Sequence, residues 1–309
     1  MVNTSITVSE FILECTATIC VLALIYSISM FANLLVIMVI ILNPQLHAPM
    51  YIYISTLAVI DLANGSILIP KMLSVLLLGS PAVPYGACVL QMFLVAHVEE
   101  MESLLLAFMA FDRYIAVIYP LHYTSVITNK KVGIGLLVSN ILDTIFKLHI
   151  LFFVGELSFC RTNILPFCFC DYSTMVRVSC NEDPKYLSSL SVAVTVSGVF
   201  PLLLILLSYS RIAMEAMKIS SEGGKSKIFS TCVTHLLVVG LFYIPLSLSF
   251  ILPGAGVMIP TETYNIMFTL GNVVPPMMNP IIYSFRNKEI NKCIYRFFAR
   301  KKSALKGRK

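Results

Sequence analysis

The chain has 309 residues, of which 58% are hydrophobic and only 12% are charged, and its mean hydropathy is +0.86. A soluble domain usually carries about 25% charged residues because its surface must face water. The composition therefore excludes an ordinary soluble domain and favours a chain whose solvent is a lipid bilayer. The net charge is +6, and ten of the 22 lysines and arginines lie in residues 286–309. In an apolar chain, a basic tail more often marks the cytoplasmic side of a membrane than a nucleic-acid site.

Seven apolar runs, each close to the ~20 residues that a membrane-spanning helix needs, follow one another in the chain. They lie at about residues 19–42, 52–78, 88–111, 132–154, 188–209, 228–252 and 262–285. Each run is predicted to be a helix, because backbone polar groups in hydrocarbon must bond within their own segment. The predicted fold is all-α: a seven-helix membrane bundle at residues 19–285, with an N-terminal segment at 1–18 and a basic tail with an amphipathic helix at 286–309.

Seven spans place the two ends of the chain on opposite sides of the membrane. The basic tail predicts a cytoplasmic C-terminus, and a polar stretch with three cysteines predicts an oxidising, extracellular compartment. We therefore expect a multi-pass plasma-membrane protein with its N-terminus outside. No basic start precedes the first apolar run, so no cleaved signal peptide is expected. Asn3 begins a glycosylation sequence on the outer side, whereas the similar sequence at Asn64 falls inside a predicted span.

The third run continues into the string MAFDRYIAVIYPLHY (109–123). Its Asp112 and Arg113 place a carboxylate beside a permanently charged guanidinium at the membrane edge. Cys88 precedes Arg113 by 25 residues, about 37 Å of helix at 1.5 Å per residue, which is enough to cross a membrane. Two further strings agree with this arrangement, LAVIDL at 57–62 and NPIIY at 279–283. Together these features resemble the rhodopsin-like G-protein-coupled receptors.

Longer strings narrow the resemblance to vertebrate odorant (olfactory) receptors. They are PMYIYISTLAVIDL (49–62), MAFDRYIAVIYPLHY (109–123), SKIFSTCVTHL (226–236) and PPMMNPIIYSFRNKEI (275–290). The even spacing of Cys160, Cys170 and Cys180 is similar too. The match runs from the first predicted helix to the tail helix. Three positions depart from the residues common in mammalian members and favour a fish-type or otherwise divergent member: Phe111, Tyr119 and Thr234.

The resemblance implies a receptor that binds a small odorant within the bundle and activates the stimulatory olfactory G protein, which raises cyclic AMP. Agonist binding would move the cytoplasmic end of the sixth helix outward, bending it at Pro245. The residues that the resemblance assigns to coupling and switching are Asp112, Arg113, Tyr114, Lys225, Lys227, Asn279, Pro280 and Tyr283. The expected partners are the odorant, the G protein and membrane lipids, without nucleic acid. Enzyme motifs such as HExxH and GxSxG are absent from the sequence, and no catalysis is expected.

The resemblance also implies a disulfide from Cys88 to Cys170 and a second one from Cys160 to Cys180. Cys168 is an additional thiol beside Cys170 and could pair in place of a neighbour. Cys293, in the tail helix, is either palmitoylated or an unmodified cysteine at the membrane interface.

The same resemblance assigns ligand binding by position to Val95, Ala96, Glu99, Lys147, Ser173, Tyr243, Ser247 and Phe250. A charge at mid-membrane costs about 2.5–3.5 kcal/mol on insertion scales, so Glu99 and Lys147 require an explanation. In one interpretation, either residue fixes a polar or ionised group of the odorant. In the other, a Glu–Lys–Asp network joins the third and fourth helices, since Lys147 lies four residues after Asp143 on the same helix face. The sequence leaves both interpretations open.

A second polar group is predicted deeper in the bundle. Asp61 and Glu102, with Asn279 on the seventh helix, resemble family positions that enclose a sodium ion. Carboxylate and amide oxygens are hard ligands that suit such an ion. The alternative is a water-linked network in which the two acids share a proton. No other cofactor is expected.

Two other classes of protein also place charges in a membrane. A transporter or channel would usually show paired halves or broken helices, and this sequence has no such internal symmetry. A rhodopsin-like receptor for a non-odorant small molecule is the second alternative, against which SKIFSTCVTHL and PPMMNPIIYSFRNKEI argue.

Overall fold

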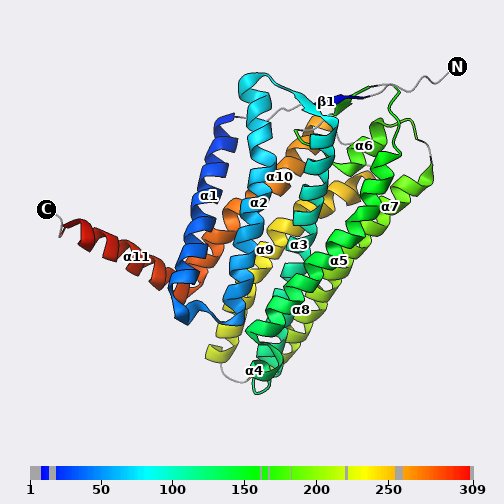
Figure 1. Ribbon diagram of the computed structural model, residues 1–309. Helices are drawn as coiled ribbons and strands as arrows, with labels where there is room; N and C mark the ends of the chain where they lie inside the picture. Colours follow the sequence, from blue (N-terminus) through cyan, green and yellow to red (C-terminus); the bar gives the residue numbers. More distant parts are fainter. Residues whose placement is uncertain are drawn as a thin grey trace.

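Long helices running side by side make up most of the chain (Figure 1). The computed structural model describes residues 8–13, 19–160, 162–165, 168–181, 183–219, 222–254 and 260–306. The long helices are α1 (Ile19–Leu42), α2 (Pro49–Leu78), α3 (Tyr85–Ile118), α5 (Asn129–Gly155), α7 (Pro184–Val194) continued by η2 (Thr195–Val199) and α8 (Phe200–Lys218), α9 (Glu222–Gly254) and α10 (Thr261–Arg286). The shorter elements are β1 (Glu10–Leu13), η1 (Pro44–Leu46), β2 (Ala82–Pro84), α4 (Tyr123–Val126), β3 (Ile164–Leu165), α6 (Tyr172–Val178) and the tail helix α11 (Lys288–Lys306).

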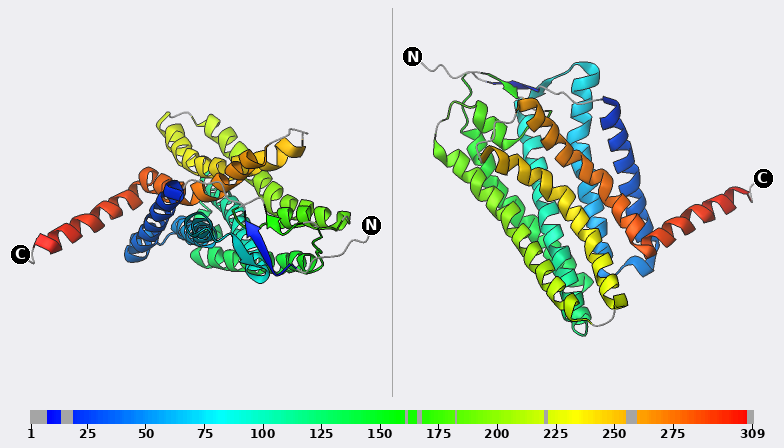
Figure 2. Two further views of the ribbon diagram at one scale, coloured as in Figure 1. Left: turned by 90° about the horizontal axis from the view of Figure 1, so that it is seen from above. Right: turned by 180° about the vertical axis from the view of Figure 1, so that it is seen from behind.

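The two ends of the bundle differ. We call the end that carries β1, β2, β3 and α6 the sheet end, and the opposite end the α4 end (Figure 1). α3 packs against α2, α5, α8 and α9, so it lies at the centre of the bundle. α11 leaves the bundle near the α4 end and projects away from it in both views of Figure 2. The start of α11 is nevertheless anchored, because Ile290 and Cys293 are buried.

Helix ends follow local sequence signals. α2 begins with Pro49, whose missing N–H would have no partner in the first turn. It ends at Gly79, which has φ 56°, a left-handed conformation that glycine adopts without a steric penalty. α5 begins where the Thr128 hydroxyl accepts a hydrogen bond from the Lys131 N–H. The predicted spans and the observed helices agree within a few residues at most ends.

The third and fifth predicted spans are the main exceptions. α3 continues seven residues beyond the predicted boundary at 111, so Asp112 and Arg113 lie within its last turns. The helix of the fifth span continues nine residues beyond the predicted boundary at 209, to Lys218. Within the described residues, five helical segments are long and apolar enough by composition alone to cross a membrane: those of α1, α2, α5, α7–α8 and α9. α3 has 34 residues and α10 has 26, so both also have the length to cross. The charges that lower the hydropathy of α3 are mostly turned into the bundle, where Glu100, Glu102 and Asp112 are buried.

The predicted span 188–209 is one continuous helix from Pro184 to Lys218 that contains a π-helical turn, η2. Such turns widen a helix and leave backbone groups without their regular partners. Here the Ser197 carbonyl accepts a hydrogen bond from the Ser103 hydroxyl of α3. The π turn therefore fixes α7–α8 to the central helix.

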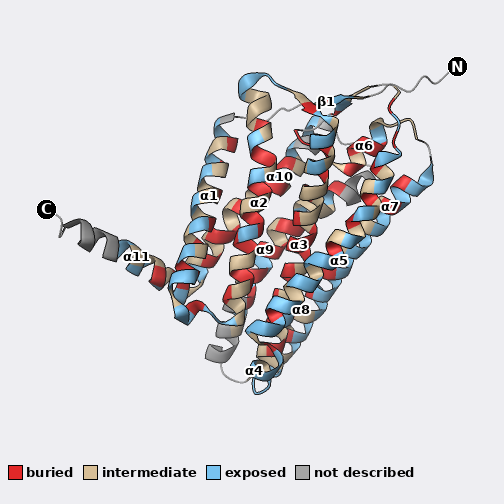
Figure 3. Ribbon diagram, in the orientation of Figure 1, coloured by how far each residue is buried: buried red, intermediate tan, exposed pale blue. Residues whose placement is uncertain are grey.

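Burial in this bundle is the reverse of that in a soluble protein. Large apolar side chains face outward, including Leu24 at 61% exposure and Leu207 at 63%. Figure 3 shows exposed residues along the outer faces of α1, α5 and α8, with buried residues toward the centre. Asn33 and Asp61, by contrast, are fully buried. An apolar outer surface around a partly polar interior is the arrangement expected in a bilayer.

The sheet end is held together by strands and disulfides. β1 pairs antiparallel with β2 and parallel with β3. The two disulfides implied by the resemblance, Cys88–Cys170 and Cys160–Cys180, are present. Cys168 is itself disulfide-bonded, so it is not the spare thiol that the sequence suggests. These links tie the segment between α5 and α7 to the start of α3.

Candidate binding cavity and switch residues

A cavity with a volume of about 170 Å³ lies among α3, α5, α7–η2, α9 and α10. The loop residues Phe169, Cys170 and Asp171 line it at the sheet end. We call it the sheet-end cavity. Its lining is mostly apolar and aromatic, with Met92, Phe93, Ile150, Tyr172, Leu190, Phe242, Leu246 and Phe268 among the residues that form it. An apolar cavity of about 150 Å³ is enough to hold benzene. The space therefore suits a small molecule rather than a peptide.

Five of the eight residues assigned to ligand binding line this cavity: Val95, Ala96, Glu99, Lys147 and Ser173. The three assigned positions on α9 do not follow them: Tyr243 and Ser247 are not among the lining residues, and the Phe250 side chain lies outside the described residues. α9 instead contributes Phe242 and Leu246, each one residue earlier. A shift of one residue rotates a helical side chain by about 100°, so α9 presents to this cavity a face next to the one that the assignment by position expects.

Tyr243 lies next to the cavity without lining it. Its hydroxyl is 2.7 Å from the Ser103 hydroxyl of α3, and Tyr243 is buried. Ser103 lines the cavity and also donates to the Ser197 carbonyl in the π turn. Ser103 thus joins three helical segments at the cavity wall, a role that sequence reasoning missed because an isolated serine in an apolar run carries no signal.

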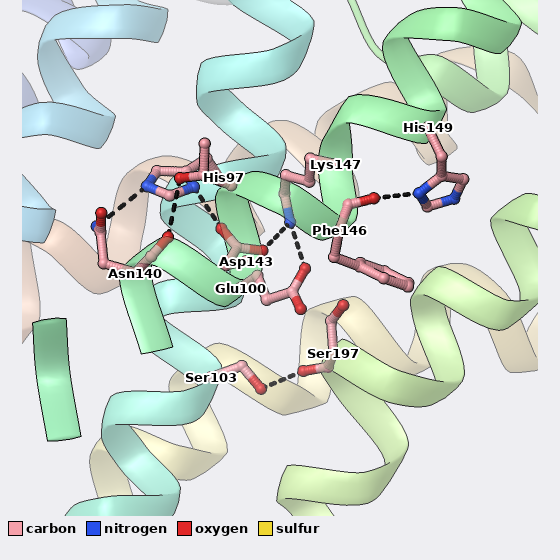
Figure 4. A network of polar contacts seen from close by, with 10 residues as sticks. His97, Glu100, Ser103, Asn140, Asp143, Phe146, Lys147, His149 and Ser197 are labelled. Atoms are coloured by element: carbon pink, nitrogen blue, oxygen red, sulfur yellow. Dashed lines mark hydrogen bonds and ion pairs between the residues drawn. The ribbon is translucent and has the colours of Figure 1, made fainter. Parts of the chain in front are cut away.

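Lys147 is the centre of a buried ionic network (Figure 4). Its ammonium contacts the Glu100 carboxylate of α3 and the Asp143 carboxylate one turn earlier on α5, the latter at 2.6 Å. The His97 ring contacts the other Asp143 oxygen, and Asn140 lies 3.3 Å from His97. Buried ions are tolerated only when they are paired. Here Lys147 pairs with Glu100 on the neighbouring helix and with Asp143 on its own. The network joins α3 to α5.

Glu99 is the neighbouring acid on α3, and its surroundings differ. It lines the sheet-end cavity and also a smaller adjoining space, which Ser249 and Asn272 border. Glu99 forms no ion pair with any described side chain. The amide of Asn272 supplies a hydrogen bond but no charge. Of the two adjacent glutamates, Glu100 is neutralised by Lys147 and Glu99 is not.

Three buried polar residues meet deeper in the bundle. Asn279 of α10 donates to Asp61 of α2 at 3.0 Å and lies 3.4 Å from Glu102 of α3. Asp61 is 0% exposed and Glu102 is 2% exposed. Neither acid forms an ion pair with a described basic side chain. The Asn279 amide oxygen is buried and has no hydrogen-bond partner among the described residues.

A second cavity, of about 410 Å³, opens at the α4 end and is called the α4-end cavity. Arg113 and Asp112 line it, together with Met50, Tyr53, Ile54, Met109, Thr234, His235, Tyr283, Arg286, Asn287, Lys288 and Glu289. Arg113 is paired with Asp112 at 2.5 Å. The Tyr123 hydroxyl donates to Asp112 at 2.9 Å. Burial and the Asp112 carboxylate raise the pKa of Tyr123, so this phenol stays protonated and remains a donor.

The other residues assigned to switching are spread around this end. Tyr114 packs edge-on against Tyr119, and Pro280 lies inside α10. Lys225 and Lys227 belong to α9, but their side chains lie outside the described residues, as does Asn3. The α4-end cavity therefore contains Asp112, Arg113 and Tyr283 from the assigned set.

An apolar outer surface, a small apolar cavity toward one end and a larger, more polar one at the other are the features of a multi-pass helical membrane protein of the receptor type. A family model described as "Olfactory receptor" matches residues 22–301. The chain is 35% identical to "Olfactory receptor 1468" of Rattus norvegicus, over 90% of this chain and 88% of that protein. It is 34% identical to "Olfactory receptor 1E16" of Mus musculus, over 91% and 88%, and 35% identical to "Olfactory receptor 1E2" of Gorilla gorilla gorilla, over 90% and 88%. The chain belongs to the olfactory receptor family, whose members are G-protein-coupled receptors with seven membrane-spanning helices.

Proposed function

We propose that the chain binds a small odorant in the sheet-end cavity and activates a stimulatory heterotrimeric G protein at the α4-end cavity, raising cyclic AMP. The observation that carries the proposal is the sheet-end cavity itself, a small apolar space with a few convergent polar groups inside a helix bundle. The sheet end faces the outside of the cell and the α4 end faces the cytoplasm. The disulfides at the first end and the basic tail beyond the second support this orientation.

The signal passes through α3 and α9. Odorant binding shifts the receptor toward an active arrangement by as much as the odorant prefers that arrangement over the resting one. Phe242 and Leu246 bring α9 into the cavity wall, and the Ser103–Tyr243 contact joins α9 to α3 beside it. When α9 moves outward at the α4 end, Arg113 is released from Asp112 and contacts the G protein.

We also propose that Asp61, Glu102 and Asn279 hold a sodium ion. Two buried acids without a basic partner among the described residues need a cation or a shared proton. The Asn279 N–H now faces both acids, and turning this amide over would bring its unpartnered oxygen to them as a third hard ligand. The residues present therefore fit the ion. A bound sodium would supply positive charge between these acids.

A cyclic AMP screen in transfected cells tests the odorant and G-protein proposals together. Cells expressing the chain should respond to members of an odorant panel, and Ala96→Phe, which fills the cavity, should abolish every response. Arg113→Ala should abolish signalling with normal surface expression, whereas Arg177→Ala, an exposed arginine of α6, should leave it unchanged.

Surface expression is read with epitope tags. An N-terminal tag should be stained on intact cells, and a C-terminal tag only after permeabilisation. Responses that survive Ala96→Phe would exclude the sheet-end cavity as the binding site. Staining of both tags on intact cells would exclude the proposed orientation.

A further inference from the structure

The walls of the sheet-end cavity carry more acidic than basic groups. Three carboxyl groups line it, from Glu99, Glu100 and Asp171, and Lys147 is the only basic residue among the described lining. A ligand in this cavity therefore meets an uneven charge distribution. The distribution depends on which acid Lys147 neutralises.

Lys147 is not available to a ligand anion. It is 3% exposed and is held between Glu100 and Asp143. An acidic odorant would have to displace one of these carboxylates and leave it buried without a partner, which is costly in a low dielectric. His97 contacts Asp143 on the side away from Lys147, so even its protonated form would balance only that acid. The carboxylates of this network thus neutralise Lys147, the one basic side chain of the described lining.

Two carboxyl groups remain. Glu99 forms no ion pair with a described side chain; the neutral Asn272 amide supplies its hydrogen bond, and the charges of Lys147 and Asp171 act on it only at longer range. Asp171 caps α6, and one of its oxygens accepts hydrogen bonds from the Ser173 hydroxyl at 2.8 Å and the Thr174 N–H at 3.2 Å. Its other oxygen, Oδ1, is buried and has no hydrogen-bond partner among the described residues. Both acids border the space that a ligand would occupy.

The rest of the lining also favours a cation. Phe93, Phe169, Tyr172, Phe242 and Phe268 surround the cavity. Aromatic faces attract an ammonium group, and the attraction strengthens as the group is desolvated. The same rings accept an alkyl or aryl chain. A carboxylate in such a setting holds either a proton or a cation, and a cationic ligand would supply the missing partner.

We infer that the odorant class is the amines: a small alkyl- or arylamine binds in protonated form, with its ammonium group on the Glu99 carboxylate, its chain among the aromatic rings, and Asp171 adding negative charge at the sheet-end wall. Alkylamines have pKa values near that of lysine, about 10.4, so they enter as cations at neutral pH. This inference rests on the proposed odorant-binding function. It identifies Glu99 as the residue that selects ligand charge.

The experiment compares matched ligands and matched variants. Straight-chain amines of four to eight carbons and benzylamine are tested beside the alcohols, aldehydes and carboxylic acids of the same carbon skeletons, with cyclic AMP as the readout. We expect the amines to be the most potent members. Glu99→Gln keeps the side-chain shape and should raise the EC50 for amines by about tenfold or more, because a hydrogen bond to a charged group contributes about 1.5–3 kcal/mol.

The controls separate charge from structure. Glu156→Gln removes a carboxylate paired with Lys185 at the end of α5, outside the cavity, and should leave the EC50 unchanged. Glu99→Asp should retain part of the amine response. Asp171→Asn keeps the cap of α6, since asparagine also caps helices, and should weaken the amine response less than Glu99→Gln.

The outcomes distinguish a failure of the amine assignment from a failure of the proposed odorant-binding function. Responses confined to acids or neutral compounds, or amine responses that Glu99→Gln leaves intact, overturn the amine assignment and preserve the odorant receptor. No response to any ligand class, with the receptor stained at the cell surface, overturns the odorant-binding proposal itself.

Discussion

The role of a buried charged residue depends on the group that pairs with it, as the adjacent residues Glu99 and Glu100 illustrate. Glu100 points to α5 and pairs with Lys147, whereas Glu99 points to the cavity and to α10. About 100° of helix rotation separates them. The first is fixed as part of the scaffold and the second is free to select a ligand.

The scaffold role of Lys147 predicts a folding defect. Lys147→Met removes the ammonium and leaves Glu100 and Asp143 facing each other in the interior. Loss of one member of a buried ion pair costs about 3–5 kcal/mol, so surface expression and thermal stability should fall sharply. The measurement is flow cytometry of tagged receptor together with the unfolding temperature in detergent.

A matched variant separates lost charge from lost packing. Lys147→Met combined with Glu100→Gln and Asp143→Asn has no unpaired ion and should recover most of the lost expression. Normal expression of the single variant with an altered order of ligand potencies would instead make Lys147 a direct ligand contact.

At the scale of elements, α3 and α9 are joined by a hydrogen bond beside the cavity. Ser103 holds both Tyr243 and the π turn of α7–α8. A ligand that packs against Phe242 and Leu246 therefore acts on a helix whose restraint lies one residue away.

Removing the contact between Ser103 and Tyr243 should raise the basal cyclic AMP level, which is measured without a ligand. Tyr243→Phe deletes the hydroxyl that joins α9 to α3 and keeps the ring. A neutral hydrogen bond contributes about 1 kcal/mol, which corresponds to a shift of about fivefold in a two-state equilibrium. Basal cyclic AMP should increase accordingly when compared at equal surface expression. Tyr26→Phe on α1 serves as the control, and equal basal activity in both variants would show that the contact does not restrain α9.

The sequence predicts these elements unevenly, for physical reasons. Apolar runs located α1 and α2 closely, because contact with lipid selects directly for apolar residues along them. The continuation of α3 past residue 111 was missed because its charged residues face other helices rather than lipid. The π turn was missed since it depends on Ser103, nearly a hundred residues away in the chain. The face of α9 that lines the cavity differs by one residue from the assignment by position, because helix rotation is set by packing and not by composition.

At the scale of the whole molecule, α3 connects two cavities through a polar layer. Glu99 lines the sheet-end cavity, Arg113 lines the α4-end cavity, and Glu102 lies between them on the same helix. Asp61 of α2 and Asn279 of α10 meet Glu102 in this layer. A change in the charge held there acts on three helices at once, so it should couple odorant binding to the state of the α4 end.

Sodium replacement tests this coupling. If Asp61, Glu102 and Asn279 hold sodium in the resting arrangement, exchanging sodium for choline at constant ionic strength should favour the active arrangement. The EC50 of any agonist should fall by about fivefold, the lower end of typical coupling between two sites. Asp61→Asn combined with Glu102→Gln removes both acids and should abolish the difference between the two salts. If the EC50 of the wild-type receptor is instead the same in both salts but changes with pH, and the double variant removes this pH dependence, the acids share a proton. The charge balance of the interior would then be met without an ion.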